Sequence, residues 1–156
     1  MVGRRNPGRG PRSERGASAV EFALILPVLI TLLGGIINFG FVFSQQIALN
    51  NAVRDAARTA VVKPISGNPK TCDETVTAAR ANMQGGIGMN SASVTLAHTR
   101  SDGSNCATGT AYPCTGSTQG ANYTLTATYT SRPPFPIPYL STFPLSAKGV
   151  FRCEYT

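Results

Sequence analysis

The stretch Arg15-Gly-Ala-Ser-Ala-Val-Glu21-Phe22 leads into a run of 22 residues, Phe22 to Phe43, without one charged side chain. At a rise of about 1.5 Å per residue, a helix of that length spans about 33 Å, which is enough to cross the hydrocarbon of a bilayer. Glu21 places one carboxylate where the apolar run begins. The stretch therefore predicts a membrane-length helix with a single acid near its start.

The residues before this helix carry most of the charge. Residues 1–16 contain five arginines and one glutamate, so they supply +4 of the net charge of +7. Arginines directly before the first apolar span hold the N-terminus on the cytoplasmic side. We therefore expect 1–16 to be a basic leader and everything after about residue 44 to lie outside the cytoplasm. The remaining charge is too dispersed to neutralise a row of phosphates, so nucleic acid is not an expected partner.

A cleaved secretory signal is the alternative interpretation of the apolar run. Such a signal has an apolar region of about 7–15 residues, with a small-x-small cleavage site close behind it. Here the run is longer, and the residues from Phe43 to Ile47 offer no such site. The sequence therefore favours a transmembrane part at residues 22–43.

The helical pattern continues beyond the apolar run and becomes amphipathic. Small apolar residues recur at helical spacing from Ala48 to Val61, as they do on the buried face of a helix. Most of them are alanine, which suits close packing against a sheet or a neighbouring helix. Pro64 and Gly67 end the pattern, so one long helix is predicted over residues 17–62.

A patch of small and polar residues lies inside the apolar run. In lipid, such residues let helices approach closely and hydrogen-bond to one another, although they are also ordinary components of membrane helices. The patch consists of Gly34, Gly35, Asn38 and Gly40.

The remaining residues, 63–156, predict a small head. Thr71-Cys-Asp-Glu74 has capping-box spacing and starts a short helix. Its narrow apolar face is expected at Val76, Ala79 and Met83. Three later segments alternate with period two, as half-buried antiparallel strands do. These segments are Ser91–Thr99, Tyr123–Thr130 and Leu145–Tyr155.

The predicted fold class is therefore α+β. A long N-terminal helix, with a membrane half and an amphipathic half, is followed by a head with a short helix and an antiparallel sheet of about three strands. The segment from Arg132 to Tyr139 contains four prolines, which favour a stiff, extended backbone. It is expected to be a rigid connection between the last two strands, and a ligand for a polyproline-binding domain is the alternative.

Four cysteines fall in the head, and an even number in an exported segment indicates a disulfide framework. Their spacings contain no Cys-x-x-Cys, and the one histidine, His98, has no cysteine or acid within three residues. A metal site is therefore not expected. Of the three possible pairings, we favour the one in which the two middle cysteines close a short loop and the two outer cysteines tie the short helix to the last strand. The expected pairs are Cys106 with Cys114 and Cys72 with Cys153.

The sequence contains little from which a catalytic site is built. It has one histidine and no Gly-x-Ser-x-Gly, His-Glu-x-x-His or phosphate-binding loop. The one acidic pair, Asp73-Glu74, stands at the start of the predicted short helix, where acids cap the helix. Neither an enzyme nor a cofactor is expected.

Two motifs resemble a known family. They are Arg15-Gly16-Ala-Ser-Ala-Val-Glu21-Phe22-Ala-Leu-Ile-Leu-Pro27 and Gln46-x-x-Leu49-x-Asn51-Ala52-x-Arg54-x-Ala56-Ala57-Arg58. With the glycine-containing span between them, they resemble the TadE-like pseudopilins of the Tad (tight adherence) pilus assembly system. The resemblance is strong over about residues 12–62, and the head matches only in outline.

The resemblance implies that a membrane prepilin peptidase cuts between Gly16 and Ala17, which makes Glu21 the fifth mature residue and Phe22 the sixth. Glycine also lets a backbone enter a protease cleft in an extended form. The cut exposes an amine at Ala17, one helical turn from Glu21. A lone carboxylate at the edge of hydrocarbon needs a partner, and this amine, on the same or a neighbouring subunit, supplies one. A carboxylate that faces headgroups, or an acid favoured at a helix start, is the alternative interpretation.

The function implied is that of a minor pilin or pseudopilin needed to assemble an adhesive Tad/Flp-type pilus. Its expected partners are the prepilin peptidase, other pilins or pseudopilins, inner-membrane pilus assembly proteins and the membrane. Its expected location is the bacterial cytoplasmic membrane, as a single-pass protein with the N-terminus inside and the head outside, and then the extracellular fibre after assembly. The alternative is an uncleaved, signal-anchored extracytoplasmic binding protein. The state of the Gly16–Ala17 bond discriminates between the two.

Overall fold

A long helix and a small mixed head make up the computed structural model, which describes residues 14–100, 103–106, 111–118, 120–135 and 141–155. The first thirteen residues of the predicted leader and the second half of the proline segment lie outside these ranges. The elements in chain order are helix α1 (Glu14–Val61), helix α2 (Cys72–Met83), a 3₁₀ turn η1 (Ser91–Ser93) and strands β1 (Thr95–Arg100), β2 (Asn122–Ser131) and β3 (Phe143–Arg152). This arrangement confirms the predicted α+β class.

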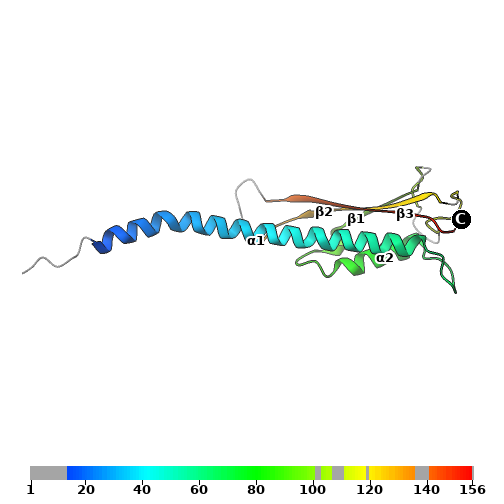
Figure 1. Cartoon of the computed structure of the whole chain (residues 1–156), viewed down its shortest axis with the longest axis horizontal. Helices are drawn as coiled ribbons and strands as arrows, with labels where there is room; N and C mark the ends of the chain where they lie inside the picture. Colours follow the sequence, from blue (N-terminus) through cyan, green and yellow to red (C-terminus); the bar gives the residue numbers. More distant parts are fainter. Residues whose placement is uncertain (1–13, 101–102, 107–110, 119, 136–140, 156) are drawn as a thin grey trace, which may run out of the picture.

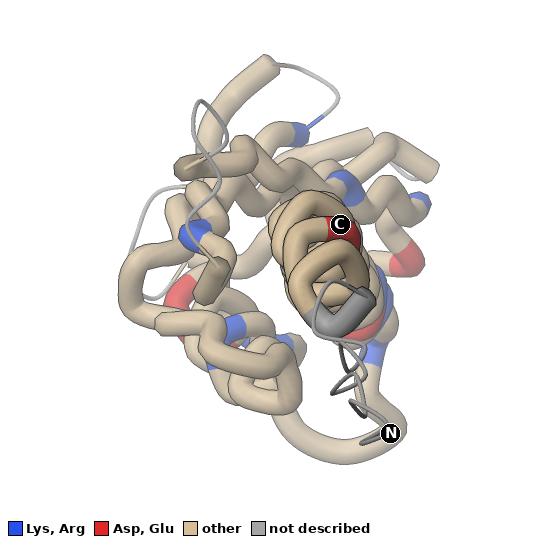
Figure 2. The backbone as a smooth tube through the Cα atoms, turned by 90° about the vertical axis from the view of Figure 1, so that its left-hand side faces the viewer, with Lys and Arg blue, Asp and Glu red and all other residues tan. Residues whose placement is uncertain are grey.

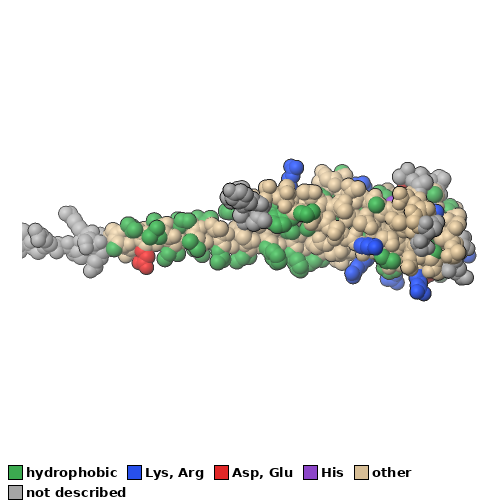
Figure 3. Space-filling view, turned by 90° about the horizontal axis from the view of Figure 1, so that it is seen from above, with side chains coloured by type: hydrophobic (Ala, Val, Ile, Leu, Met, Phe, Trp, Pro, Cys, Tyr) green, Lys and Arg blue, Asp and Glu red, His purple; other side chains and the backbone are tan. Residues whose placement is uncertain are grey.

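The head is built around the second half of α1. In Figure 1 the sheet lies along one side of that half and α2 lies on the other, while the first half extends alone. Figure 2 looks along α1 and shows the other elements arranged around it. The space-filling view in Figure 3 therefore has a narrow part and a wide part. The helix is at once a protruding rod and the central element of the head.

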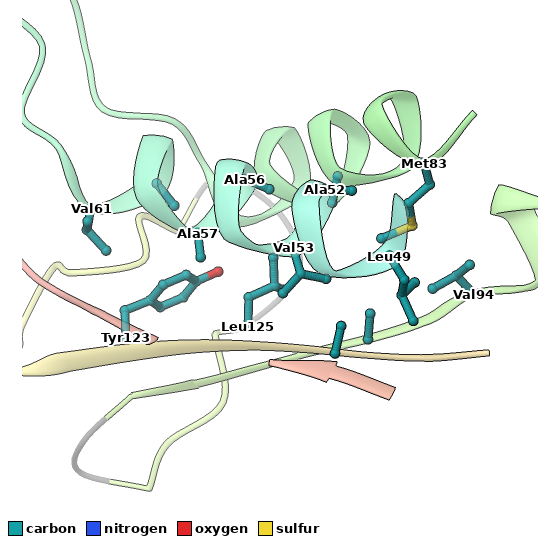
Figure 4. Close-up of a cluster of buried hydrophobic side chains, with 14 of the residues drawn as sticks. Leu49, Ala52, Val53, Ala56, Ala57, Val61, Met83, Val94, Tyr123 and Leu125 are labelled. Atoms are coloured by element: carbon teal, nitrogen blue, oxygen red, sulfur yellow. The ribbon is translucent and has the colours of Figure 1, made fainter. Parts of the chain in front are cut away.

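The three strands form an antiparallel sheet in the order β1-β2-β3. Leu125 and Ala127 of the central strand face α1 and are fully buried, and Leu125 pairs with Gly149 of β3. A Cβ on Gly149 would stand 3.0 Å from the carbonyl oxygen of Val53 and 3.1 Å from the Cβ of Ala57. The alanine-rich face of α1 thus packs directly on the sheet, as its small residues predict. Figure 4 shows this packing, with Tyr123 and Leu125 directed toward the helix.

Two strand boundaries, the start of β1 and the end of β3, differ from the predicted ones by more than two residues. Ser91–Ser93 forms a 3₁₀ turn rather than the start of β1, because the guanidinium of Arg80 donates to the carbonyls of Ser91 and Ala92 at 2.6 and 3.1 Å. These carbonyls are therefore not available to a strand partner. Strand β3 ends at Arg152 rather than Tyr155, because the chain turns to α1 and the amide of Glu154 donates to the carbonyl of Val61 at 3.1 Å.

Helix α2 begins with the predicted capping box. The amide of Glu74 donates to the Thr71 hydroxyl at 3.2 Å, and the Thr71 amide donates to the Glu74 carboxylate at 2.8 Å. Its buried face differs from the predicted one, since Val76 is only half-buried. The face consists of Cys72, Thr75, Ala79 and Met83.

The cysteine pairing that we favoured from the sequence is wrong. Cys72 pairs with Cys106 and Cys114 with Cys153, with Cα–Cα distances of 6.3 and 5.7 Å. The reason is the path of the chain between β1 and β2. The Cys72 amide donates to the carbonyl of Ala111 at 2.9 Å, which brings this segment to the start of α2. The guanidinium of Arg100 donates to the carbonyls of residues 112 and 113 at 2.9 Å each, and this places Cys114 beside the end of β3.

Candidate functional site

The first half of α1 is an apolar helix without intramolecular cover. Every residue from 16 to 33 is exposed, and only 6% of the helix's most apolar 18-residue window is buried. A helix that is apolar on all sides is normally buried in a core or in a membrane. On the face seen in Figure 3, apolar side chains cover the narrow part, and Lys and Arg side chains lie only on the wide part. By length and composition, α1 can therefore cross a membrane.

The predicted processing bond lies at the start of this helix. Gly16 and Ala17 belong to the first turn of α1, both are exposed, and a Cβ added at Gly16 would meet nothing within 4 Å. The first four amides of a helix have no intrahelical partner, and terminal turns fray at little cost. The bond is therefore open to solvent at the end of the helix where unwinding is easiest.

The predicted charge-pairing residues follow on the same helix. Glu21 and Phe22 are both exposed, and Phe22 has 64% of its surface accessible. Glu21 is the one charged residue between Gly16 and Arg54. Its Cα lies about 6 Å along the helix axis from that of Ala17, since four residues separate them. A carboxylate at this position can accept a hydrogen bond from an amine at residue 17 or from the end of a neighbouring helix.

Three side-chain amides of α1 hold the backbone of the head. The amide nitrogen of Asn38 donates to the carbonyl of Phe135 at 2.7 Å, and its oxygen accepts from the Phe135 amide at 3.0 Å. The amide nitrogen of Gln45 donates to the carbonyl of Ile87 at 2.9 Å, and that of Gln46 donates to the carbonyl of Ser146 at 2.8 Å. The side of α1 that faces the head therefore begins well before the alanine stripe.

The contact nearest to the N-terminus of α1 is formed by Gly34, Asn38 and Phe135, and we call it the clasp. The ring of Phe135 lies over Gly34, and a Cβ there would stand 2.5 Å from a ring carbon. Asn38 is 5% exposed although it lies in the apolar run. Two of the four residues in the predicted small-residue patch are thus occupied by the head, while Gly35 and Gly40 have no atom within 4 Å of an added Cβ. The patch is not free for a neighbouring helix at Gly34 and Asn38.

A buried histidine lies in the head, far from these contacts along the chain. His98 is 8% exposed, and its Nδ1 is hydrogen-bonded to the hydroxyl of Tyr123, which is completely buried. Burial lowers the pKa of His98 below its usual value, and the carboxylate of Asp73 opposes this only in part. Burial also raises the pKa of Tyr123 well above its usual value. The pair is a neutral hydrogen bond inside the core.

No metal site is formed by the residues that the structure describes, because no three His, Cys, Asp or Glu side chains gather there. All four predicted cysteines are instead in disulfides within the head. The sequence signals that mark the clasp are weak, since Asn38 and Phe135 are 97 residues apart. A polar amide in the middle of an apolar run was the one available sign.

The structure defines a class of protein in which one exposed apolar helix, compatible with a membrane anchor, carries a small disulfide-linked α+β head. Within that class, the model of the TadE-like protein family matches residues 16–58. This match confirms the resemblance noted in the sequence and is consistent with a TadE-like protein of the Tad system. TadE-like proteins are structural pilus components rather than enzymes. A comparison with curated proteins gives no match, and neither does a comparison with solved structures.

Proposed function

We propose that this chain is a pseudopilin-like minor pilin, processed by a prepilin peptidase and required to assemble an adhesive Tad-type pilus. One observation carries the proposal: the family-matching helix is exposed on all sides from residue 16 to 33, while its second half forms the core of the head. An apolar rod of this kind needs cover from lipid before assembly and from other helices after it. Such a helix suits a subunit that leaves the bilayer to join a fibre.

The chemistry at the start of the helix supports processing. The basic leader would keep the Gly16–Ala17 bond at the cytoplasmic face, where the peptidase acts. Removal of the leader takes away +4 of the net charge of +7 and leaves Glu21 near a new amine. The head would then lie on the opposite side of the cytoplasmic membrane. Its partners would be the peptidase, other pilins or pseudopilins and the inner-membrane assembly proteins.

The proposal predicts that the protein loses its leader when it is co-expressed with an active prepilin peptidase. Intact-mass analysis of the membrane-purified chain should give an N-terminus at Ala17. The variant Gly16→Leu should remain uncut, because the larger side chain obstructs the cleft. Gly35→Leu is a matched control, since both glycines are helical and have open space around an added Cβ. A wild-type chain that keeps Met1 or Val2 would contradict processing and favour an uncleaved binding protein.

The role of Glu21 is tested separately by fibre assembly. Glu21→Gln keeps the size of the side chain and removes its charge, so we expect cleavage to continue while piliation is lost. Glu21→Asp keeps the charge on a shorter stem and should retain part of the assembly. Normal fibres with Glu21→Gln would show that charge pairing is not what this residue contributes.

A further inference from the structure

The clasp joins the head to α1 inside the apolar run of the helix. The head covers the helix from Gly34 onward, yet the apolar run continues to Phe43. Along the axis, Gly34 and Asn38 lie about 20 and 26 Å beyond Glu21, at 1.5 Å per residue. The hydrocarbon of a bilayer is about 30 Å thick. If Glu21 marks one face of that layer, the clasp lies inside the other half of it.

The depth of the clasp depends on where the hydrocarbon layer begins. Counted from Ala17, the same two residues lie about 26 and 32 Å along the axis, at the far boundary of the hydrocarbon. With the layer beginning at Ala17, Phe135, which contacts Gly34 and Asn38, is at the depth where acyl chains meet headgroups. This is the layer of a bilayer in which aromatic side chains gather. With the layer beginning at Glu21, this contact lies about 4–10 Å inside the far boundary of the hydrocarbon.

The backbone of residues 133–135 is suited to that depth. Non-helical backbone in a bilayer needs partners for its polar groups, because lipid offers none. Asn38 binds both the amide and the carbonyl of Phe135, and Pro133 and Pro134 have no backbone N–H to satisfy. None of these three residues therefore carries an unpaired backbone donor that would keep it out of lipid.

The side chains around the clasp present a suitable surface. Phe135 keeps 36% of its surface accessible, and Phe39 and Phe43 on neighbouring turns of α1 keep 74% and 55%. Pro134 is also exposed. Arg132 is exposed at the end of β2, where its long side chain can reach lipid phosphates while its stem lies on apolar surface. Exposed apolar side chains therefore occur both on this part of α1 and at residues 134–135.

We propose that residues 132–135, directly after β2, are a second membrane contact of this protein, with Pro134 and Phe135 lying in the interfacial layer of the leaflet on the head side. The inference rests on the proposed function in one respect, since it takes α1 to cross the bilayer. The clasp then fixes the head against the membrane surface at one depth, instead of leaving it to pivot on a bare helix.

Single-tryptophan depth measurement tests this directly, because the chain contains no tryptophan. The full chain would be reconstituted in vesicles of phosphatidylcholine and phosphatidylglycerol. Four variants are needed: Phe135→Trp, Pro134→Trp, Leu29→Trp as the helix reference and Ile65→Trp as the reference for the far end of the head. Fluorescence would be measured with lipids brominated near the headgroup or near the chain end, and with aqueous acrylamide. Ile65 is fully exposed in the structure.

We expect Phe135→Trp to lose fluorescence with the lipid brominated near the headgroup and to be shielded from acrylamide. Leu29→Trp should be quenched by lipid bromine, and Ile65→Trp only by acrylamide. Pro134→Trp should behave like Phe135→Trp, and it replaces an exposed side chain rather than the one that packs on Gly34.

Three results would overturn the inference. If both loop variants behave like Ile65→Trp while Leu29→Trp is quenched by lipid, residues 132–135 are in water and the proposed function still stands. If Leu29→Trp is not quenched by lipid, α1 does not cross the bilayer, and the proposed function fails as well. If lipid quenching of the loop disappears as the protein-to-lipid ratio rises, a second copy of the chain covers the loop instead of lipid.

Discussion

Replacement of Asn38 by leucine should release the β2–β3 connection from α1 without unfolding the rest of the head. Leucine has a similar size but no hydrogen-bonding group, so the bonds of 2.7 and 3.0 Å to Phe135 are lost. Each hydrogen bond contributes about 1 kcal/mol net, and a backbone group left unsatisfied raises the loss. A total of about 2–3 kcal/mol corresponds to an opening equilibrium raised by roughly 30- to 150-fold.

Amide hydrogen exchange measures this opening, because the Phe135 amide itself donates to Asn38. The full chain in lipid nanodiscs would be compared with Asn38→Leu by mass spectrometry of peptides that contain Phe135. Asn51→Leu is the matched control, since Asn51 is an exposed amide on the same helix. Unchanged exchange at Phe135 in Asn38→Leu would refute the role assigned to this amide, and so would an equal rise in the control.

Further predictions concern the head. The lowered pKa of His98 means that the unfolded state binds the proton more tightly. The free energy of unfolding should therefore fall as the pH drops below about 6.5, by at most about 1.4 kcal/mol per pH unit. In urea titrations from pH 7 to 5, His98→Gln should remove this part of the pH dependence of stability, and an unchanged pH dependence would contradict the prediction. Removal of the Cys114–Cys153 disulfide by double alanine substitution should lower the free energy of unfolding by about 3–4 kcal/mol, given its loop of 39 residues. Non-reducing peptide mapping of the parent chain should recover this pair, and recovery of Cys106 joined to Cys114 would overturn the observed pairing. Gly149→Val should destabilise the head by about 1–3 kcal/mol through overpacking against α1, which would lower its thermal midpoint. Val150→Ala on the outer face should change the midpoint little. Equal midpoints for the two variants would show that α1 is not in close contact with the sheet at Gly149.

The elements of this fold could be predicted because their signals are local. The 3.6-residue period and the uncharged run marked α1 to within three residues at its start and one at its end. Thr71 and Glu74 marked the start of α2 through a capping box that spans one turn. Period-two alternation located the three strands. The main errors came where groups from other elements, the Arg80 side chain or the Val61 carbonyl, took the carbonyls or amides next to a strand end.

The candidate site also has a local part that could be predicted from the sequence and a long-range part that could not. The order of Gly16, Ala17 and Glu21 along one helix is a property of the sequence, and the structure adds that all three are exposed at the end of the rod. The clasp could not be predicted, because Asn38 and Phe135 meet only after the sheet has folded against α1. Local patterns record which face of an element is apolar, but not which distant backbone will need a hydrogen-bonding partner.

The sequence by itself determined that this protein has a long apolar helix, a small α+β head and a TadE-like N-terminal segment, since periodicity, charge and short motifs act over a few residues. Only the tertiary structure decided which cysteines pair and how far the head reaches along the helix. Both depend on the path of the chain between the strands, which brings Cys114 to Cys153 and Phe135 to Asn38. These are contacts between segments far apart in sequence, and their geometry exists only once the chain is packed.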